Sequence, residues 1–272
     1  MRTITAAALL CLILALALPL VISAHSEPEE DPPASGDVAG MDSELSFSVL
    51  TDGSIETVTM SDWLPGVVAG EMPASFEPEA LKAQAVAART YIMYSMGREK
   101  SAHPEADVCD DPGCCKAHAS DETLRQNWGE SYESNWAKIL EAVRSTDGEY
   151  MSYGGEVIQA VFHSSSAGRT EDSAAIWQAQ PYLVSVDSPE TAEDVPNYVS
   201  SLSVSPEDFK STVQTLHPEA QLDGDPAYWL GAAVHDASGR VESVDIGGAQ
   251  VPGTELRTLF ELRSTAFALD YT

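Results

Sequence analysis

The sequence predicts an α+β fold, in which β-hairpins and helices surround a cleft and follow an N-terminal membrane segment. Two helical patterns near the middle of the chain are flanked on both sides by stretches of alternating apolar and polar residues. These stretches occur in pairs joined by short turns, which is typical of hairpins and not of the regular strand–helix alternation of a parallel sheet. The sequence shows no internal repeat. The residues after position 43 suffice for one sizeable domain or two closely joined domains.

An apolar segment opens the chain. Residues 4–24 carry no charge, follow Arg2 and precede an acidic stretch. About 20 apolar residues can cross a bilayer, and the position of Arg2 predicts that the bulk of the chain lies outside the cytoplasm. The large Ile22 disfavours cleavage after Ala24. We therefore expect residues 1–24 to be a single-pass cell-membrane anchor with an extracytoplasmic C-terminal part; cleavage and secretion are the alternative.

The next segment is acidic. Residues 25–43 combine Asp and Glu with Pro and Gly and lack the apolar residues that a core needs, which predicts a disordered linker. We expect the folded domain to span residues 44–272. The formal net charge of −29, with only 14 Lys and Arg, excludes nucleic acid as an expected partner, because binding a phosphate backbone needs clustered cations.

The first elements of the domain follow from local signals. Alternating residues around an Asp-Gly turn predict a hairpin over 44–60. Two helices should follow, because Pro73 prevents the first helix from continuing and the residues from Ser75 to Pro78 are typical of a helix start. Glu71 therefore ends the first helix and faces the second.

Two cations stand out on the second of these helices. Lys82 and Arg89 are seven residues apart, which places them on one stripe roughly 10 Å apart on a helix otherwise rich in Ala. We expect both to point towards the Glu71 turn and to bind substrate. The alternative is that they reach solvent or pair with surface acids such as Glu79.

The later elements are predicted from the same signals. They are an irregular stretch over 100–121, a helix over 131–145, a hairpin of 149–153 with 156–163, a helix over 205–216, a hairpin of 229–235 with 241–246, a helix over 254–262 and a strand over 265–271. The strand 156–163 delivers His163 to a serine-rich loop. No Gly-x-Ser-x-Gly elbow is present, so a Ser–His hydrolase is not expected. Taken alone, His163 is predicted to be a hydrogen-bonded residue at a strand end.

The cysteines outside the apolar segment form a metal-ligand pattern. His103, Cys109, Cys114 and Cys115 read His-x5-Cys-x4-Cys-Cys, which offers four N and S ligands to a tetrahedral Zn²⁺. Four protein ligands would close the coordination shell and make the zinc structural. A disulfide is the alternative in an exported protein, although it leaves one thiol over. His118 is a reserve ligand.

The chain resembles the stage II sporulation protein D family, which shares a domain with amidase-enhancer proteins. The stretch Gly-Glu-Met-Pro-Ala-Ser-Phe, followed by residues 79–91, carries this resemblance, and it continues at 107–110, 162–171, 181–189 and 253–265. It therefore covers essentially residues 44–272. Some members of the family hold zinc with two His and two Cys, and Cys114 stands where a His is usual. Two further departures are Phe76 in place of Trp and Ala167 in place of Gly.

The resemblance implies a lytic transglycosylase that cleaves peptidoglycan glycan strands, with Glu71 of the Glu-Met-Pro motif as its acid. One carboxylate suffices because the C6 hydroxyl of muramic acid can act as the nucleophile, which gives 1,6-anhydromuramic acid. The family motif that lines the substrate cleft falls on His163, Ser164, Ser166, Gly168, Thr170 and Glu171. The implied substrate is a strand denuded of stem peptides. A cell-wall amidase and a membrane protein of the engulfment machinery are the implied partners.

A second function class stays open. The amidase-enhancer branch implies a cell-wall binding module that activates an amidase without catalysis of its own. A structural coat protein is a third interpretation. The joint presence of Glu71, Lys82, Arg89 and the serine-rich loop favours the enzyme.

Overall fold

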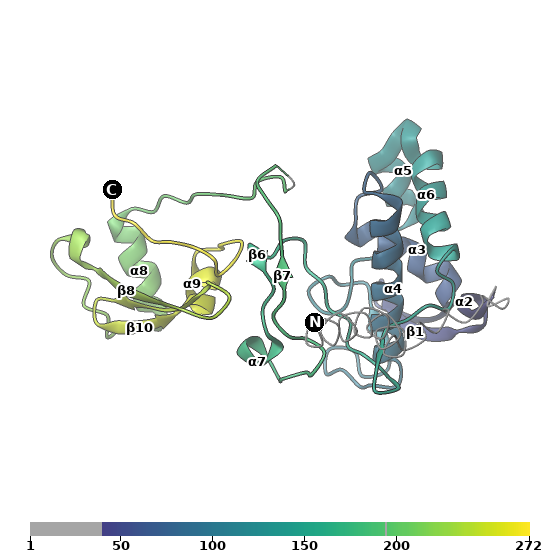
Figure 1. The fold of residues 1–272 in the computed structure, drawn as a ribbon, viewed down its shortest axis with the longest axis horizontal. Coiled ribbons are helices and arrows are strands. Elements are labelled where there is room, and N and C mark those ends of the chain that lie inside the picture. Colours follow the sequence, from purple (N-terminus) through teal and green to yellow (C-terminus); the bar gives the residue numbers. More distant parts are fainter. Residues whose placement is uncertain (1–39, 194) are drawn as a thin grey trace, which may run out of the picture. The chain divides into compact units, whose positions relative to one another are not determined.

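The computed structural model describes residues 40–193 and 195–272, which form two compact units (Figure 1). The first unit ends at Val161 and the second is Phe162–Thr272; the sequence leaves open one sizeable domain or two closely joined domains. Helices and small sheets occur in both, which confirms the α+β class. The expected anchor 1–24 lies outside the described residues, as do positions 25–39 of the expected linker. Among the residues described, no helix has both the length and the apolar character needed to cross a membrane.

A three-stranded sheet begins the first unit. The predicted hairpin is formed by β1 (Ser46–Thr51) and β2 (Ser54–Thr59), and β3 (Val108–Cys109) pairs parallel to β1. At the turn, Asp52 and Gly53 have φ values of 49° and 74°, the left-handed conformations that a two-residue hairpin turn favours. The pairing of Leu50 with Cys109 brings the cysteine-rich segment onto this sheet.

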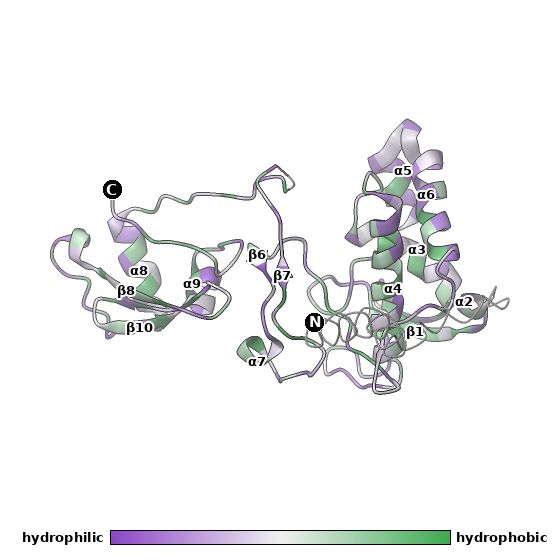
Figure 2. Cartoon of the chain, viewed as in Figure 1, coloured by the Kyte–Doolittle hydropathy of each residue, from purple (hydrophilic) through white to green (hydrophobic). Residues whose placement is uncertain are grey.

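Three helices pack beside the sheet: α3 (Met60–Glu71), α4 (Pro78–Ser95) and α6 (Tyr132–Arg144). Their contact surfaces are apolar and fully buried, as at Leu64, Leu81 and Ile139. Figure 2 shows hydrophobic residues along these helices, whereas α5 (Asp121–Trp128), which we did not predict, is mainly hydrophilic. The predicted helix end at Glu71 is confirmed, because α3 ends at this residue and α4 begins at Pro78. Glu77 is the N-cap of α4 without a side-chain bond, so Ser75 is not its cap.

The end of the expected linker is folded. The short helix α2 (Met41–Glu44) begins inside it, and Asp42 is buried. The carboxylate of Asp147 accepts hydrogen bonds from the amides of Gly40 and Asp42. The predicted boundary at residue 43 is therefore wrong by a few residues, because a buried acid cannot be recognised from a polar composition.

The predicted strand 156–163 is mostly absent. Only β4 (Ser152–Tyr153) and β5 (Glu156–Val157) pair, and Ile158 donates one further bond to the carbonyl of Met151. The amide of Met151 donates instead to Oγ1 of Thr90 on α4, at 3.0 Å, so the ladder is not extended. His163 therefore does not lie at the end of a strand.

The second unit is built on a sheet with the order β10-β9-β8. Its strands are β8 (Leu230–His235), β9 (Val241–Ile246) and β10 (Ala249–Pro252), and it packs with α8 (Pro206–Leu216) and α9 (Gly253–Leu259). The predicted helix 205–216 and the β8–β9 hairpin are confirmed. The predicted strand 265–271 is wrong, because β9 already has a partner on each edge and only the carbonyl of Thr265 bonds to it.

Three short elements precede this sheet. The strands β6 (Gly168–Arg169) and β7 (Asp187–Ser188) pair antiparallel, and α7 (Ser173–Ile176) lies between them in the chain. The serine-rich loop, residues 163–171, which we call the serine loop, contains β6, and α7 and β7 follow it in the chain.

Candidate functional site

Glu71 is the last residue of α3 and is half-buried. Its Oε1 accepts a hydrogen bond from the backbone amide of Ala117, with an N···O distance of 2.9 Å. This amide comes from a segment 46 residues away in the chain, so it holds one oxygen of the carboxylate in place through a long-range contact. Val67 and Val68 are buried in the same helix, whereas Phe76 is 47% exposed.

Residues 115–119, which we call the strap, run along α3. The amide of Ala119 donates to the carbonyl of Gly66 at 3.0 Å, and the ring of His118 stacks on Trp63 with a centroid distance of 3.7 Å. A Cβ on Gly66 would lie 2.2 Å from the His118 ring, and one on Gly70 would lie 3.2 Å from Ala117. The two glycines of α3 therefore make the surface that the strap occupies.

Lys116 supplies a cation beside Glu71 that the sequence analysis missed. Burial lowers the pKa of the Lys116 ammonium, and the negative charge of Glu71 opposes this shift. Its Nζ also lies 4.5 Å from the centroid of the Tyr91 ring. The only sequence signal for Lys116 is its position directly after Cys114 and Cys115. This position does not show that the segment packs against Glu71.

Arg89 does not have the expected role. It is 1% exposed, and its guanidinium forms a bidentate ion pair with Asp42, with a shortest N···O distance of 2.7 Å. It also donates to the backbone carbonyls of Val143 and Glu149. The prediction that Arg89 points to the Glu71 turn and binds substrate is therefore wrong: the residue ties α4 to α2 and α6, and buried guanidinium groups require such partners.

Lys82 follows the alternative interpretation instead. Its Nζ pairs with Glu79 at 2.8 Å, and its side chain is one-third exposed. The bond to Glu79 raises the pKa of Lys82, and Glu141 and Glu149 add smaller contributions of the same sign. The acids that act on it thus belong to α4 and to the region of α6, not to the Glu71 turn.

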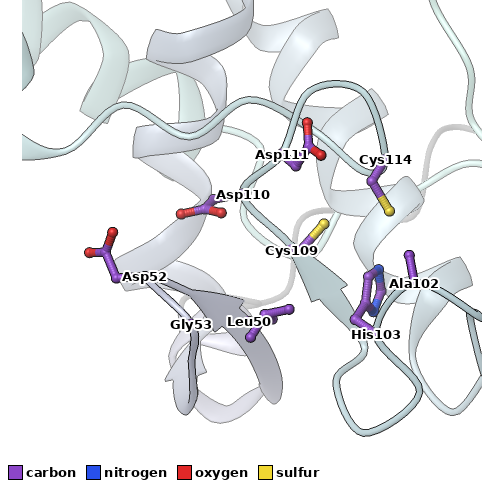
Figure 3. A pocket seen from close by; sticks show the side chains of 9 residues that line it. All are labelled: Leu50, Asp52, Gly53, Ala102, His103, Cys109, Asp110, Asp111 and Cys114. Carbon is purple, nitrogen blue, oxygen red and sulfur yellow. The ribbon is translucent and has the colours of Figure 1, made fainter.

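The four predicted metal ligands come together. The donor atoms of His103, Cys109, Cys114 and Cys115 all lie within 4.8 Å of one another, and the three cysteines are free thiols. Figure 3 shows the sulfurs of Cys109 and Cys114 beside the imidazole of His103. The reserve ligand His118 lies instead against Trp63.

The geometry of this cluster suits a metal ion. Nδ1 of His103 is 2.9 Å from the carbonyl of Ala106 and can donate to it, which leaves Nε2, 3.2 Å from Sγ of Cys115, to act as a ligand. Three sulfurs and one imidazole nitrogen at this spacing are the donor set of a four-coordinate Zn²⁺ site.

The thiols of the cluster differ in their acidity. Burial raises the pKa of Cys109 to about 12. Burial also opposes ionisation of Cys115, but a hydrogen bond from Lys100, with an Nζ···Sγ distance of 3.0 Å, lowers its pKa to about 7. Lys100 donates as well to the hydroxyl of Tyr91 at 2.9 Å. One cation therefore stabilises the thiolate that begins the strap.

The serine loop is organised by a residue that the sequence analysis missed. Oε1 of Glu190 accepts bonds from the amides of Ser166 and Ala167, both at 2.6 Å, and from the hydroxyl of Ser165 at 2.8 Å. Burial raises the pKa of Glu190, but these hydrogen bonds stabilise the carboxylate and lower the pKa below its usual value. Ala167 has a φ of 58°, the left-handed conformation in which a Cβ costs about 1 kcal/mol. Nothing in the local sequence marks Glu190 for this task.

The predicted residues of the serine loop separate into two groups. Ser166 is buried, and Glu171 lies in an ion pair, with its Oε2 3.1 Å from Nη1 of Arg240. Arg240 also donates from Nη2 to the carbonyl of Ser166. His163 and Ser164 are exposed, and Thr170 is half-buried and bonded to Val186. Ser166 and Glu171 therefore hold the loop together, whereas His163 and Ser164 present side chains to solvent.

Comparison with known proteins identifies the family of the chain. Residues 51–153 match the family model described as Stage II sporulation protein, and this range contains Glu71, the strap and the four-residue cluster. The chain is 36% identical to Stage II sporulation protein D of Bacillus subtilis (strain 168) over 217 residues, which are 79% of this chain and 61% of that protein. It is 35% identical to the protein of the same name from Bacillus amyloliquefaciens, with the same coverage.

A further relative has a different name. The Amidase enhancer of Bacillus subtilis (strain 168) is 33% identical over 183 residues, which are 66% of this chain and 21% of that protein. The chain thus spans 61% of the length of the first relatives and a smaller share of the enhancer. These similarities show that the chain belongs to the stage II sporulation protein D family.

Proposed function

We propose that the protein is a lytic transglycosylase that cleaves glycan strands of peptidoglycan, with Glu71 as its only acid and base. The observation that carries this proposal is the placement of Glu71 at the end of α3, where Ala117 binds Oε1 and leaves Oε2 for proton transfer. The proposed substrate is a strand denuded of stem peptides, and the proposed product ends in 1,6-anhydromuramic acid.

Glu71 and the groups beside it have separate roles in the proposed reaction. Glu71 donates its proton to the leaving glycosidic oxygen and then takes the proton of the C6 hydroxyl, so that one carboxyl group serves both steps. The Ala117 amide keeps the carboxyl group oriented. Lys116, whose charge acts on Glu71, is the cation that we propose to face the lactyl carboxylate of the substrate. Separately from Glu71, we propose that the exposed His163 and Ser164 of the second unit contact sugar.

We also propose that His103, Cys109, Cys114 and Cys115 bind a structural Zn²⁺. A bound Zn²⁺ would supply folding energy, since four protein ligands leave no position for a reacting molecule. Protein purified without chelator should contain about one zinc per chain, and Cys115→Ser should lower both the zinc content and the melting temperature. Absence of metal together with a single free thiol among Cys109, Cys114 and Cys115 would instead establish a disulfide.

We also propose partners and a cellular location for this activity. A relative named Amidase enhancer supports a connection with a cell-wall amidase, which would remove the stem peptides before strand cleavage. Membership of a sporulation family supports a role in spore engulfment. We propose residues 1–24 as the membrane anchor and a membrane protein of the engulfment machinery as a second partner.

Mass spectrometry of products decides the function. Peptidoglycan should be incubated with the protein with and without prior amidase treatment, and anhydromuramic ends should form only, or mainly, on the treated material. Glu71→Gln should lower turnover by roughly 10²–10⁴, because an amide cannot exchange the proton. Glu79→Gln is the matched control, since Glu79 is an exposed carboxylate on the next helix. Reducing ends in place of anhydro ends would show that water attacks and that a second carboxylate takes part.

The second candidate function is amidase activation without catalysis, and the similarity to the Amidase enhancer favours it. In that case the wild-type protein binds denuded glycan, releases no product and accelerates a separate amidase. Glu71→Gln would then leave the acceleration unchanged, which separates the two functions in one experiment.

A further inference from the structure

The strap connects the four-residue cluster to Glu71. Cys115 belongs to the four-residue cluster, and Ala117, two residues later, donates its amide to Oε1 of Glu71. Two residues of extended chain span at most about 7 Å. A displacement of the Cys115 backbone is therefore transmitted over a short stretch of chain to the amide that holds Glu71.

The other end of the strap is fixed to α3. Ala119 bonds to the carbonyl of Gly66, and His118 fills the space above that glycine and stacks on Trp63. Ala117 thus lies between two anchors, the cluster at Cys115 and the surface of α3. Only the first of these anchors depends on a metal.

A second physical connection runs through two lysines. The Nζ atoms of Lys100 and Lys116 lie 4.9 Å and 4.5 Å from the centroid of the same ring, that of Tyr91. Lys100 donates to the sulfur of Cys115, and Lys116 interacts with the charge of Glu71. The cluster and the carboxylate therefore share one aromatic residue and its two cations.

We infer that the strap couples the metal site to Glu71, so that binding of the metal and orientation of the carboxylate are one event. This inference rests on the proposed zinc site and gives Glu71 its orientation in the proposed reaction. It assigns the strap, and Ala117 in particular, a positioning role beyond the stabilisation of the fold.

Coupling between two sites is reciprocal, which makes it measurable without catalysis. If zinc holds the Ala117 amide against Glu71, then Glu71 must strengthen the binding of zinc by the same factor. Loss of one hydrogen bond to a charged acceptor corresponds to roughly a 10- to 150-fold change in an equilibrium constant. Glu71→Ala should therefore raise the zinc Kd by this factor, and Glu71→Gln, which keeps a neutral acceptor, by less.

The experiment measures zinc Kd by competition with a chromophoric chelator, using the full chain and zinc alone as the probe. Glu79→Ala is the matched control and should leave the Kd unchanged, because Glu79 is exposed and its carboxylate pairs with Lys82 on its own helix. Gly70→Ala is a second variant that keeps Glu71: its Cβ pushes on Ala117, so it should also weaken zinc binding. Circular dichroism establishes that each variant is folded.

The outcomes separate this inference from the proposed function. A raised Kd for Glu71→Ala or, if that variant does not fold, for Glu71→Gln supports the coupling even in a protein that proves to lack transglycosylase activity. A Kd equal to that of the wild type in the folded Glu71 variants overturns the coupling, whatever their turnover. Failure of the wild-type chain to bind zinc at about one ion per chain overturns it as well.

Discussion

Glu71 in the first unit and Glu190 in the second unit are both held by backbone amides, yet the two carboxylates are suited to different tasks. Glu190 directs one oxygen at two amides and a hydroxyl, and these bonds lower its pKa. Glu71 accepts one amide, from Ala117. A carboxylate surrounded by donors is a fixed anion that shapes a loop. A carboxylate held at one oxygen keeps its other oxygen for the proton transfer that we propose for Glu71.

The buried ion pair of the first unit and the ion pair of the serine loop differ in their exposure to solvent. Arg89 and Asp42 have side chains that are 1% and 5% exposed, whereas Arg240 and Glu171 are 11% and 21% exposed. The Arg89–Asp42 pair therefore lies within the helical core of the first unit. The second unit uses partly exposed contacts to hold the serine loop.

The largest effect is expected from breaking the buried pair of the first unit. Arg89→Ala leaves the carboxylate of Asp42 buried without its partner, which should lower the free energy of unfolding by about 3–5 kcal/mol. Urea denaturation followed by circular dichroism measures this change. Arg89→Lys keeps the charge but not the bidentate geometry and should fall between Ala and wild type. A loss below about 1 kcal/mol would show that Arg89 is not a structural residue and would reopen its assignment to substrate.

A moderate, local effect is expected in the second unit from Glu190→Gln. The neutral amide accepts the same bonds less strongly, so the amides of Ser166 and Ala167 should exchange faster with deuterium. Glu190→Asp, which is shorter, tests the geometry while keeping the charge. Unchanged exchange in both variants would mean that Glu190 does not organise the loop.

The same contact predicts the sign of a pH effect. Because the pKa of Glu190 is lower in the folded state, its stabilisation is present above the ordinary carboxyl value of about 4.5 and is lost as the pH falls through the lowered pKa. Exchange at Ser166 should therefore accelerate in acid beyond the intrinsic trend. In Glu190→Gln this additional acceleration should disappear.

The smallest effect on stability is expected for Lys82→Ala. The exposed pair with Glu79 contributes little, so the urea midpoint should remain nearly unchanged, in contrast to Arg89→Ala. Because Lys82 pairs with Glu79, we also expect KM for denuded glycan to stay unchanged in this variant, whereas a raised KM would restore the substrate-binding role expected from the sequence. An unchanged KM would leave Lys82 as a solvent-exposed residue of α4.

Local signals in the sequence determined much of the fold. The Asp52-Gly53 turn, the prolines at positions 73 and 78, and Ser205 at the start of α8 restrict the backbone within a few residues, and the structure has the predicted elements at these positions. The spacing of His103 and the three cysteines also predicted a cluster that the structure assembles. Such signals work because sterics and capping act between neighbours in the chain.

Tertiary structure decided which side chains meet. Lys82 and Arg89 share a helical stripe, but only Arg89 finds a buried acid, and that acid is 47 residues away in a segment that resembles a linker. The strap reaches Glu71 because Gly66 and Gly70 leave room for it. Periodicity gives the face of a helix and says nothing about what packs on that face. The local sequence therefore determined that Glu71 ends a helix, whereas its amide donor, its neighbouring cation and the short chain distance between that donor and the four-residue cluster depend on long-range packing for their effect.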